Sequence, residues 1–380
     1  MKGAGPVMAV MGIFLSVQVA KAQWTPAKRL TWNSSYSVEP NIAIRSFGDP
    51  YVVWSDYSPG YWEIFYKKSA DGGATWSTSQ RLTWTTSGSA DQVIAVDSSG
   101  NLHVVYYDGL PGKWQIYYTK SADGGANWTT SRRLTWTSGW AYSPAIAVTY
   151  PGNLHVVWQD DTPGNSEIYY RRSTDRGATW STSQRLTWSS GKSECPAIAV
   201  DTSGNLHVVW QDDAPGNSEV YYRRSTDGGT TWTPSKRLSW TLLGSWNPAI
   251  AGDSAGHLHV VWEAGNGEIY YKKSTDGGAT WSISQRLTWT SENSYYPAIA
   301  VDPSGNLHVV WDDNTPGNPE VYYKKSTDGG ATWTTSQRLT WNSGDSWHPT
   351  IAADSSGNLH VVWDDDTPGN FEIYYKKFIK

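Results

Sequence analysis

The sequence contains almost no cysteine or methionine and few phenylalanines. Its 380 residues include one Cys, three Met and five Phe. The single thiol, Cys195, cannot form an intramolecular disulfide, so packing rather than cross-links must stabilise the fold. Basic residues are slightly outnumbered by acidic ones, which gives a formal net charge of −5. Because nucleic-acid binding requires a basic surface, this charge argues against a nucleic-acid partner.

Long apolar runs and helical periodicity are also missing, apart from one stretch near the N-terminus. Residues 7–19 are mostly apolar and follow Lys2, and Ala20-Lys21-Ala22 matches the small-residue pattern of a signal-peptidase site. The run is too short to span a bilayer well. Residues 1–22 are therefore predicted to be a secretory signal peptide, with a retained anchor as the alternative. The mature chain is expected to be extracellular or periplasmic, without a membrane span.

Tryptophan, tyrosine and glycine are abundant, with 25, 23 and 36 residues. Wide aromatic residues together with turn residues favour short strands over helices. The phrase Arg-Leu-Thr-Trp, with Ser for Thr in one copy, recurs at intervals of 49 or 52 residues. Its copies begin at Arg29, Arg81, Arg133, Arg185, Arg237, Arg286 and Arg338. Four β-rich runs of about five to seven residues per interval predict a seven-bladed β-propeller with four antiparallel strands in each blade.

The two ends of the chain are expected to share the last blade. The final repeat stops after its third strand, and residues 23–32 closely match the fourth-strand segment at 231–240. The N-terminal strand is therefore predicted to complete the last blade and close the ring, which removes open sheet edges. The mature chain, 23–380, is expected to be one domain with blades at about 40–84, 92–136, 144–188, 196–240, 248–289, 297–341 and 349–380.

The pattern Ser-x-Asp-x-Gly-x-x-Trp joins the third and fourth strands in six repeats. It resembles the Asp-box, or BNR repeat, of the sialidase-like propellers. Its Asp and Trp residues are Asp71, Trp76, Asp123, Trp128, Asp175, Trp180, Asp227, Trp232, Asp276, Trp281, Asp328 and Trp333. Asp and Gly favour a tight turn, and Trp offers a wide apolar surface that fits between blades. The box is therefore predicted to stabilise the fold rather than to catalyse a reaction.

The resemblance leaves the function open, because Asp-boxes also occur in xyloglucanases and sortilin-type receptors. For a sialidase it implies three clamping arginines, a Tyr–Glu nucleophile pair, an Asp acid/base and usually an Arg-Ile-Pro motif. The sequence has no Arg-Ile-Pro. Its repeated arginines are expected to pair with the Glu that opens each third strand, and its six repeated histidines to belong to the scaffold. No catalytic residue and no metal ligand is predicted, and an exo-sialidase-like glycoside hydrolase stays the alternative.

Five tryptophans stand outside the repeated positions, and all five fall in loops after second or fourth strands. Strand parity places these loops on one face of the ring. With two tyrosines in the same loops, they form the candidate ligand-binding set: Trp62, Trp114, Trp140, Tyr142, Trp246, Tyr295 and Trp347. An exposed aromatic ring suits the apolar face of a sugar, although such rings also cover loop backbone. The other 20 tryptophans occupy repeated positions and are expected to belong to the scaffold.

The same face carries acidic loops, such as residues 158–167 and Asp364 to Asp366. Grouped carboxylates suit Ca²⁺, but the loops lack EF-hand spacing, and a solvated acidic turn is the alternative. Taken together, these features predict a secreted, monomeric, non-catalytic propeller without a cofactor that binds extracellular carbohydrate. A protein-binding platform is a further alternative, which the sequence does not separate from the first.

Overall fold

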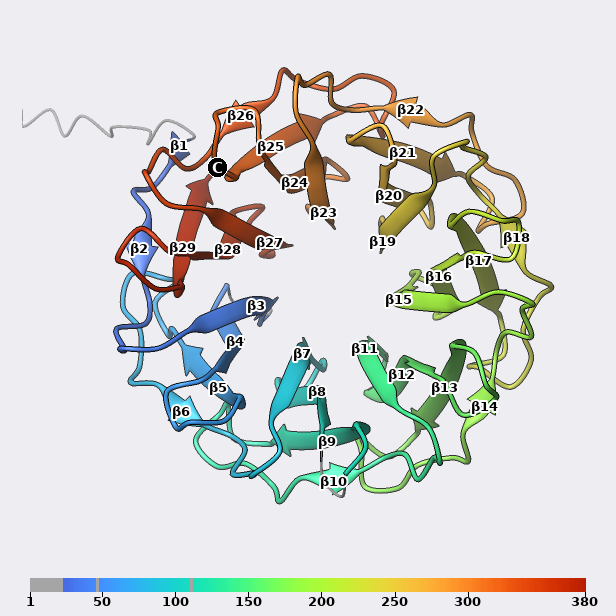
Figure 1. Ribbon diagram of the computed structural model, residues 1–380, viewed down its shortest axis with the longest axis horizontal. Coiled ribbons are helices and arrows are strands. Elements are labelled where there is room, and N and C mark those ends of the chain that lie inside the picture. Colours follow the sequence, from blue (N-terminus) through green and yellow to red (C-terminus); the bar gives the residue numbers. More distant parts are fainter. Residues whose placement is uncertain (1–22, 46–47, 110–111) are drawn as a thin grey trace, which may run out of the picture.

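Seven small antiparallel sheets stand around a central axis. The computed structural model describes residues 23–45, 48–109 and 112–380, so the predicted signal peptide lies outside the described residues. Each sheet forms one blade, and the ring of blades is seen face-on in Figure 1. The described residues form strands and turns only, and none of their segments is a helix that could cross a membrane. The predicted seven-bladed β-propeller is confirmed.

The strands of six blades run outward from the axis in chain order, and in the seventh the outermost strands come from the N-terminal segment. The innermost strands are β3 (Ser37–Ile44), β7 (Ser89–Val96), β11 (Ala141–Thr149), β15 (Ser193–Val200), β19 (Ser245–Gly252), β23 (Ser294–Val301) and β27 (Ser346–Ala353). The second strands are β4 (Pro50–Asp56), β8 (Leu102–Asp108), β12 (Asn153–Asp160), β16 (Leu206–Asp212), β20 (Leu258–Ala264), β24 (Leu307–Asp313) and β28 (Leu359–Asp365).

The fourth, outermost strand of each blade is much shorter than the other three. The third strands are β5 (Glu63–Lys68), β9 (Gln115–Ser121), β13 (Glu167–Ser173), β17 (Glu219–Ser225), β21 (Glu268–Ser274), β25 (Glu320–Ser326) and β29 (Glu372–Ile379). The fourth strands are β6 (Gln80–Arg81), β10 (Arg132–Arg133), β14 (Gln184–Arg185), β18 (Lys236–Arg237), β22 (Gln285–Arg286), β26 (Gln337–Arg338) and β2 (Lys28–Arg29), with β1 (Gln23–Trp24) beside β29.

The prediction of five to seven residues was wrong for the fourth strands, and a side chain explains why. In the first blade, the Leu82 N–H still donates to the Ile64 carbonyl at 2.8 Å. The Ile64 N–H, however, donates to the Thr83 hydroxyl at 2.9 Å instead of to a main-chain carbonyl. A hydroxyl that replaces the backbone acceptor ends the ladder after two residues while still satisfying the buried N–H.

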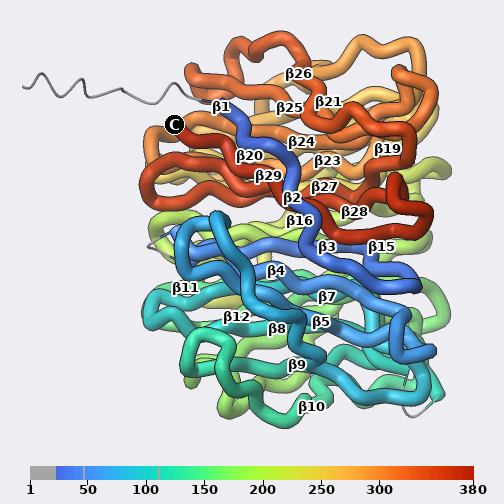
Figure 2. The backbone as a smooth tube through the Cα atoms, turned by 90° about the vertical axis from the view of Figure 1, so that its left-hand side faces the viewer, coloured from blue at the N-terminus to red at the C-terminus, as the bar shows by residue number. Residues whose placement is uncertain are grey.

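The ring closes as the sequence predicts. Lys28 and Arg29 of β2 pair with Tyr375 and Tyr374 of β29, so the N-terminal segment supplies the outer strand of the seventh blade. In Figure 2 this segment runs along the outside of the last blade before it enters β3. Leu30 is buried there. The sheet of the last blade therefore contains both ends of the described chain.

Each Asp-box tryptophan packs against a tyrosine of the preceding blade. Trp232 of the fourth blade, for example, meets Tyr170 of the third edge-on, with ring centroids 5.1 Å apart. Trp24 makes the same contact with Tyr323 where the ring closes. The other pairs are Trp76–Tyr375, Trp128–Tyr66, Trp180–Tyr118, Trp281–Tyr222 and Trp333–Tyr271. An equivalent tryptophan thus lies at every seam between blades, and the Asp-box lies at six of the seven seams.

Candidate functional site

One position in each innermost strand departs from the regular strand backbone. Every first strand contains a β-bulge where its register against the second strand shifts. The bulged residue has a left-handed backbone, with φ between 48° and 55°. The seven residues at this position are Glu39, Asp91, Ser143, Cys195, Asn247, Tyr296 and His348. Seven otherwise similar blades therefore present seven different side chains at equivalent places.

Second-strand side chains of neighbouring blades hold several of these bulges in place. The Cys195 N–H donates to the Gln159 side chain at 3.0 Å, and the Asn247 N–H donates to Gln211 at 3.0 Å. The Glu39 N–H donates to the Asp364 carboxylate at 3.1 Å in the same way. Non-glycine residues adopt such a backbone at a cost, and the surrounding structure must compensate for it. Bulges of this kind re-aim side chains, here toward the axis.

These residues surround a hollow of about 400 Å³ at the axis, because all seven blades contribute to its lining. A second hollow of about 490 Å³ adjoins it and shares Glu39, Tyr296 and His348 with the first. Trp62 and Trp347 line the second hollow. We call the two hollows together the axial mouth. It lies on the face that carries the loops after second and fourth strands.

Carboxylates and one histidine set the electrostatics of the axial mouth. Burial, reinforced by the nearby carboxylate of Asp91, raises the pKa of Glu39 to about 7. Burial alone would lower the pKa of His348, but the hydrogen bond to Asp364 and the charges of Glu39 and Asp312 raise it to about 9. The His348 Nδ1 lies 3.0 Å from Asp364 Oδ1. At neutral pH the imidazole is therefore a cation amid several acidic groups.

Burial also raises the pKa values of three further groups around the mouth. Burial raises the pKa of Asp312 well above its ordinary value, and it also raises the pKa of Glu263. Burial raises the pKa of the Cys195 thiol to about 12. A thiol with so high a pKa is protonated at neutral pH and is a poor nucleophile.

The structure brings the predicted aromatic residues into separate groups. Trp62 and Trp347 line the axial mouth. Trp114, Trp140 and Tyr142 form a second cluster, in which the Trp114 ring centroid lies 4.7 Å from Trp140 and 5.8 Å from Tyr142. Trp246 and Tyr295 belong to neither group.

The bulged residues themselves, above all Glu39 and His348, escaped the sequence analysis. The signal was present in the sequence, because the residue that follows the position of Trp347 differs in every blade. The predicted residues Tyr142, Trp246, Tyr295 and Trp347 each stand one residue before the bulged position. A comparison of the repeats column by column would have found the bulged position.

The rings of the Arg-Leu-Thr-Trp tryptophans are not buried in the scaffold. Trp32, Trp84, Trp136, Trp188, Trp240, Trp289 and Trp341 are all strongly exposed, between 65% and 72%. Each ring lies beside the arginine three residues before it. The Arg81 Cζ, for example, lies 5.7 Å from the Trp84 ring centroid. The short fourth strand ends before the tryptophan, which leaves its ring at the outer rim of the propeller.

The repeated acidic, basic and histidine residues are occupied by contacts within the scaffold. Arg81 meets Glu63 at 2.7 Å, and five other blades repeat this ion pair; blade two has Gln115 instead of Glu. The His155 Nδ1 lies 2.7 Å from the Tyr170 hydroxyl inside the blade, and five other buried histidines repeat that contact. These equivalent groups are spread around the ring, so they do not converge on one ligand.

Most of the chain matches one known protein family. The model of the BNR repeat-like domain family matches residues 10–209, 64–309 and 152–361 in overlapping stretches. The chain belongs to this family. No curated protein matches the sequence.

Solved structures share the fold of this BNR-repeat protein at low sequence identity. A protein of unknown function from Dyadobacter fermentans is 15% identical with a TM-score of 0.58, covering 94% of this chain and 98% of that one. A polysaccharide lyase, an ulvan lyase, is 11% identical with a TM-score of 0.65 and coverages of 92% and 95%. A sialidase from Streptococcus pneumoniae is 14% identical with a TM-score of 0.54 and coverages of 92% and 70%. These likenesses establish the fold alone.

The described lining of the axial mouth contains none of the clamping arginines that the sialidase resemblance implies. Neither Arg nor Lys is among the described residues that line its two hollows. The acidic loops on the same face are engaged with their own backbone: Asp365 accepts the Thr367 N–H at 3.0 Å, and Asp366 accepts the Asp345 N–H at 2.7 Å. Within the described ranges, no group of three or more His, Cys, Asp or Glu side chains is placed to hold a metal ion.

Proposed function

We propose that the protein is a secreted, non-catalytic binding module that holds extracellular carbohydrate at the axial mouth. The observation that carries the proposal is the pairing of the aromatic rings of Trp62 and Trp347 with polar side chains in one hollow of about 490 Å³. Ligand sites of this size combine aromatic walls with a few polar groups that fix orientation. A pyranose ring has both kinds of surface, with C–H groups on its faces and hydroxyls at its edge.

The charge of the mouth favours neutral or amine-bearing sugars over sialic acid. Its lining supplies carboxyl groups from Glu39, Asp91 and Asp364, against the single imidazolium of His348. The His348 charge is already directed at Asp364, at 3.0 Å. An anionic sugar would bring a further negative charge to this site without a free cation to receive it, whereas an amino group would gain carboxylate partners.

A glycan array probed with residues 23–380 tests the proposal. The array should include neutral, amine-bearing and sialylated glycans, and the wild type should bind members of the first two classes. Trp347→Ala and Trp62→Ala are each expected to weaken binding roughly tenfold, as truncation of an aromatic anchor does.

Trp188→Ala is the matched control, because this ring is 68% exposed at the outer rim, away from the mouth. Equal affinity of the wild type and both mouth variants would remove the mouth as the site. Binding of no glycan at all would favour a protein partner, which a pull-down with the same variants would then identify.

One observation favours a second function, a glycoside hydrolase at the same mouth. A Glu39 carboxyl with a pKa of about 7 has the property required of a general acid, which must be protonated near the working pH. Sustained release of a fluorophore from an aryl glycoside by purified protein, abolished in Glu39→Gln, would establish this activity. Release at the rate of the buffer blank would leave the non-catalytic function.

A further inference from the structure

The seam between the first and second blades is built differently from the other six. In six blades a cation on the third strand crosses to the preceding blade and donates to the main-chain carbonyl of the fourth-strand leucine. The pairs are Lys67–Leu30, Arg171–Leu134, Arg223–Leu186, Lys272–Leu238, Lys324–Leu287 and Lys376–Leu339. The second blade has Thr119 at this position. The Thr119 hydroxyl donates to the Thr129 carbonyl of its own blade at 2.7 Å, so it does not reach Leu82.

A second departure from the repeat lies in the same blade. The buried aromatic residue of the second strand is Trp in six blades and Tyr106 in this one. In blades one, three, four, six and seven the indole N–H donates to the aspartate two residues later. The Tyr106 hydroxyl instead donates to Ser131 at 2.5 Å. Two departures from the repeat therefore coincide at one seam.

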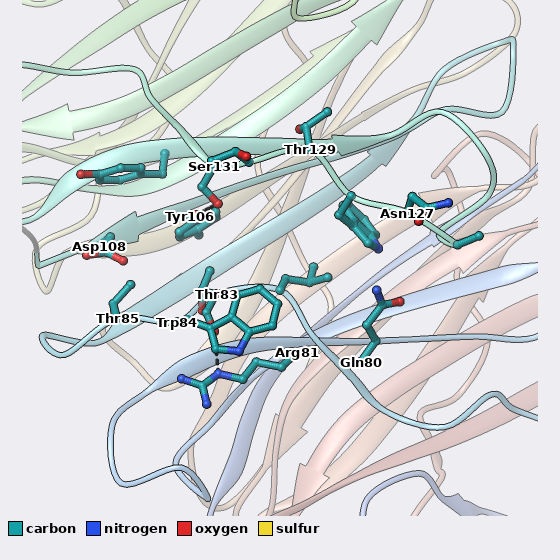
Figure 3. A pocket seen from close by; sticks show the side chains of 15 residues that line it. Gln80, Arg81, Thr83, Trp84, Thr85, Tyr106, Asp108, Asn127, Thr129 and Ser131 are labelled. Carbon is teal, nitrogen blue, oxygen red and sulfur yellow. Dashed lines mark hydrogen bonds between the residues drawn. The ribbon is translucent and has the colours of Figure 1, made fainter.

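A pocket of about 490 Å³ lies in the outer wall at this seam, and we call it the seam pocket. Figure 3 shows the Trp84 indole beside Arg81 on one wall, with Tyr106, Ser131 and Asp108 across from it. Trp84 is 72% exposed, the most exposed of the seven rim tryptophans. Asn127 and Gln80 add amide groups to the lining.

The seam pocket has the chemistry of a site for a neutral sugar. The Arg81 guanidinium is paired with the Glu63 carboxylate, with 2.7 Å between Nη2 and Oε1. Asp108 in the lining is a buried carboxylate that accepts the Ser89 hydroxyl at 2.8 Å. An anionic ligand would meet this carboxylate without an unpaired cation. A flat apolar ring surface with polar groups around it matches the C–H face and the hydroxyls of a pyranose.

We propose that the seam pocket between the first two blades is a second carbohydrate site, distinct from the axial mouth, which binds a neutral pyranose stacked on Trp84. β-Linked glucose units are the best match, because their ring hydroxyls are all equatorial and leave flat C–H faces. The blade repeat itself supplies the most direct test. Thr119→Arg introduces the residue that the third and fourth blades have at this position. In the third blade, Arg171 crosses the equivalent space, and its Cζ lies 5.7 Å from the Trp136 ring centroid.

The experiment is a calorimetric titration of residues 23–380 with cellohexaose and with laminarihexaose. One seam site per chain is expected for at least one of them, with affinity reduced roughly tenfold or more by Trp84→Ala and by Thr119→Arg. Thr119→Arg is expected to keep or raise the Tm, because it adds a donor for the Leu82 carbonyl. A loss of binding by this variant would therefore not reflect misfolding.

Trp240→Ala is the matched control. Trp240 is 66% exposed and borders another rim hollow, across which Lys272 donates to the Leu238 carbonyl at 2.7 Å. This variant should bind like the wild type. The proposal is overturned if neither sugar binds, if Thr119→Arg binds as well as the wild type, or if Trp240→Ala lowers affinity as much as Trp84→Ala. Trp347→Ala in the same titration reports on the axial mouth separately, so the two sites fail independently.

Discussion

A repeated tyrosine, such as Tyr170 of the third blade, connects three parts of the scaffold. The Tyr170 hydroxyl meets His155 Nδ1 within its own blade at 2.7 Å. The same ring supports Trp232 of the next Asp-box. The hydroxyl also lies so close to Gly229 of that box that an added Cβ would stand 2.0 Å from it. The box glycine is thus required by its neighbour in the preceding blade as well as by its own turn.

Gly229→Ala should therefore destabilise the fold by about 3 kcal/mol or more, because a left-handed backbone and a clash act together. Gly204→Ala is the control with a matched backbone: its φ is +80° against +85° for Gly229, and no atom lies within 4 Å of its added Cβ. That variant should lose only about 1 kcal/mol. Urea unfolding of both variants measures the difference, and equal losses would show that the tyrosine contact is not limiting.

The raised pKa of Glu39 predicts that the stability of the fold depends on pH. Its pKa is raised by burial and by Asp91, from 4.5 to about 7, so the folded protein binds this proton more tightly than the unfolded chain. Stability should fall as pH rises from about 4.5 to 7, because the buried carboxyl must ionise. The pKa of His348 is also raised, to about 9, and its contribution is lost only at higher pH, between about 6.5 and 9.

The measurement is the Tm of wild type and Glu39→Gln at intervals between pH 4.5 and 6.5, below the His348 window. The variant has no proton to lose at this position, so its Tm should decline less over that range. Glu292→Gln, at an exposed loop position, should follow the wild type. Parallel curves for all three proteins would show that Glu39 ionises freely in the folded state.

At the scale of elements, the fourth strand shows where a sequence stops being informative. Repeats, alternation and turn residues predict four strands per blade, and the Arg–Glu pairs follow from their equivalent positions. Arg237, for example, meets Glu219 at 2.7 Å, and that glutamate is fully buried. The hydroxyl of Ser239 also donates to it. No periodicity in the sequence reveals that a side chain will end this strand after two residues and expose Trp240.

The candidate sites were predictable only in part, for a related reason. Loop parity places Trp62 and Trp347 on one face, and both line the axial mouth. Their partners Glu39 and His348 depend on a β-bulge, which redirects a side chain without changing the apolar pattern around it. The seam pocket likewise lies where the Thr119 hydroxyl bonds within its own blade and does not reach the Leu82 carbonyl of the first blade. Contacts between repeats cannot be read from one repeat alone.

At the scale of the whole molecule, sevenfold repetition makes departures from symmetry informative. Equivalent residues around a ring point in seven directions and cannot converge on one ligand unless they stand at the axis. The two hollows proposed as sites agree with this geometry. One lies at the axis, where seven different side chains meet, and the other lies at the seam where Thr119 and Tyr106 replace the residues of the repeat.

Ring closure also belongs to this scale, and it predicts the effect of removing the N-terminal segment. Without residues 23–32, Glu372 would lose Arg29, which it meets at 2.7 Å. Tyr323 would lose Trp24, and β29 would lose both of its outer partners, β1 and β2. A buried carboxylate without its cation and an open strand edge both disfavour the folded monomer. The truncated chain should unfold at a lower temperature and self-associate.

Light scattering after gel filtration and a thermal scan measure both effects. The control is a variant whose chain starts at Asn33. Its Phe378–Lys380 is replaced by the sequence of residues 225–231 followed by that of residues 24–32. The seventh blade is then complete, but its fourth strand is supplied by the C-terminus and no longer joins the two ends of the chain. If blade completion is what matters, this variant should be monomeric with a Tm near that of the wild type. If the tie between the ends matters, its Tm should fall toward that of the truncated chain. A truncated chain with an unchanged Tm and monomeric mass would contradict both, because it would mean that the first blade and the core hold the ring closed without the strand.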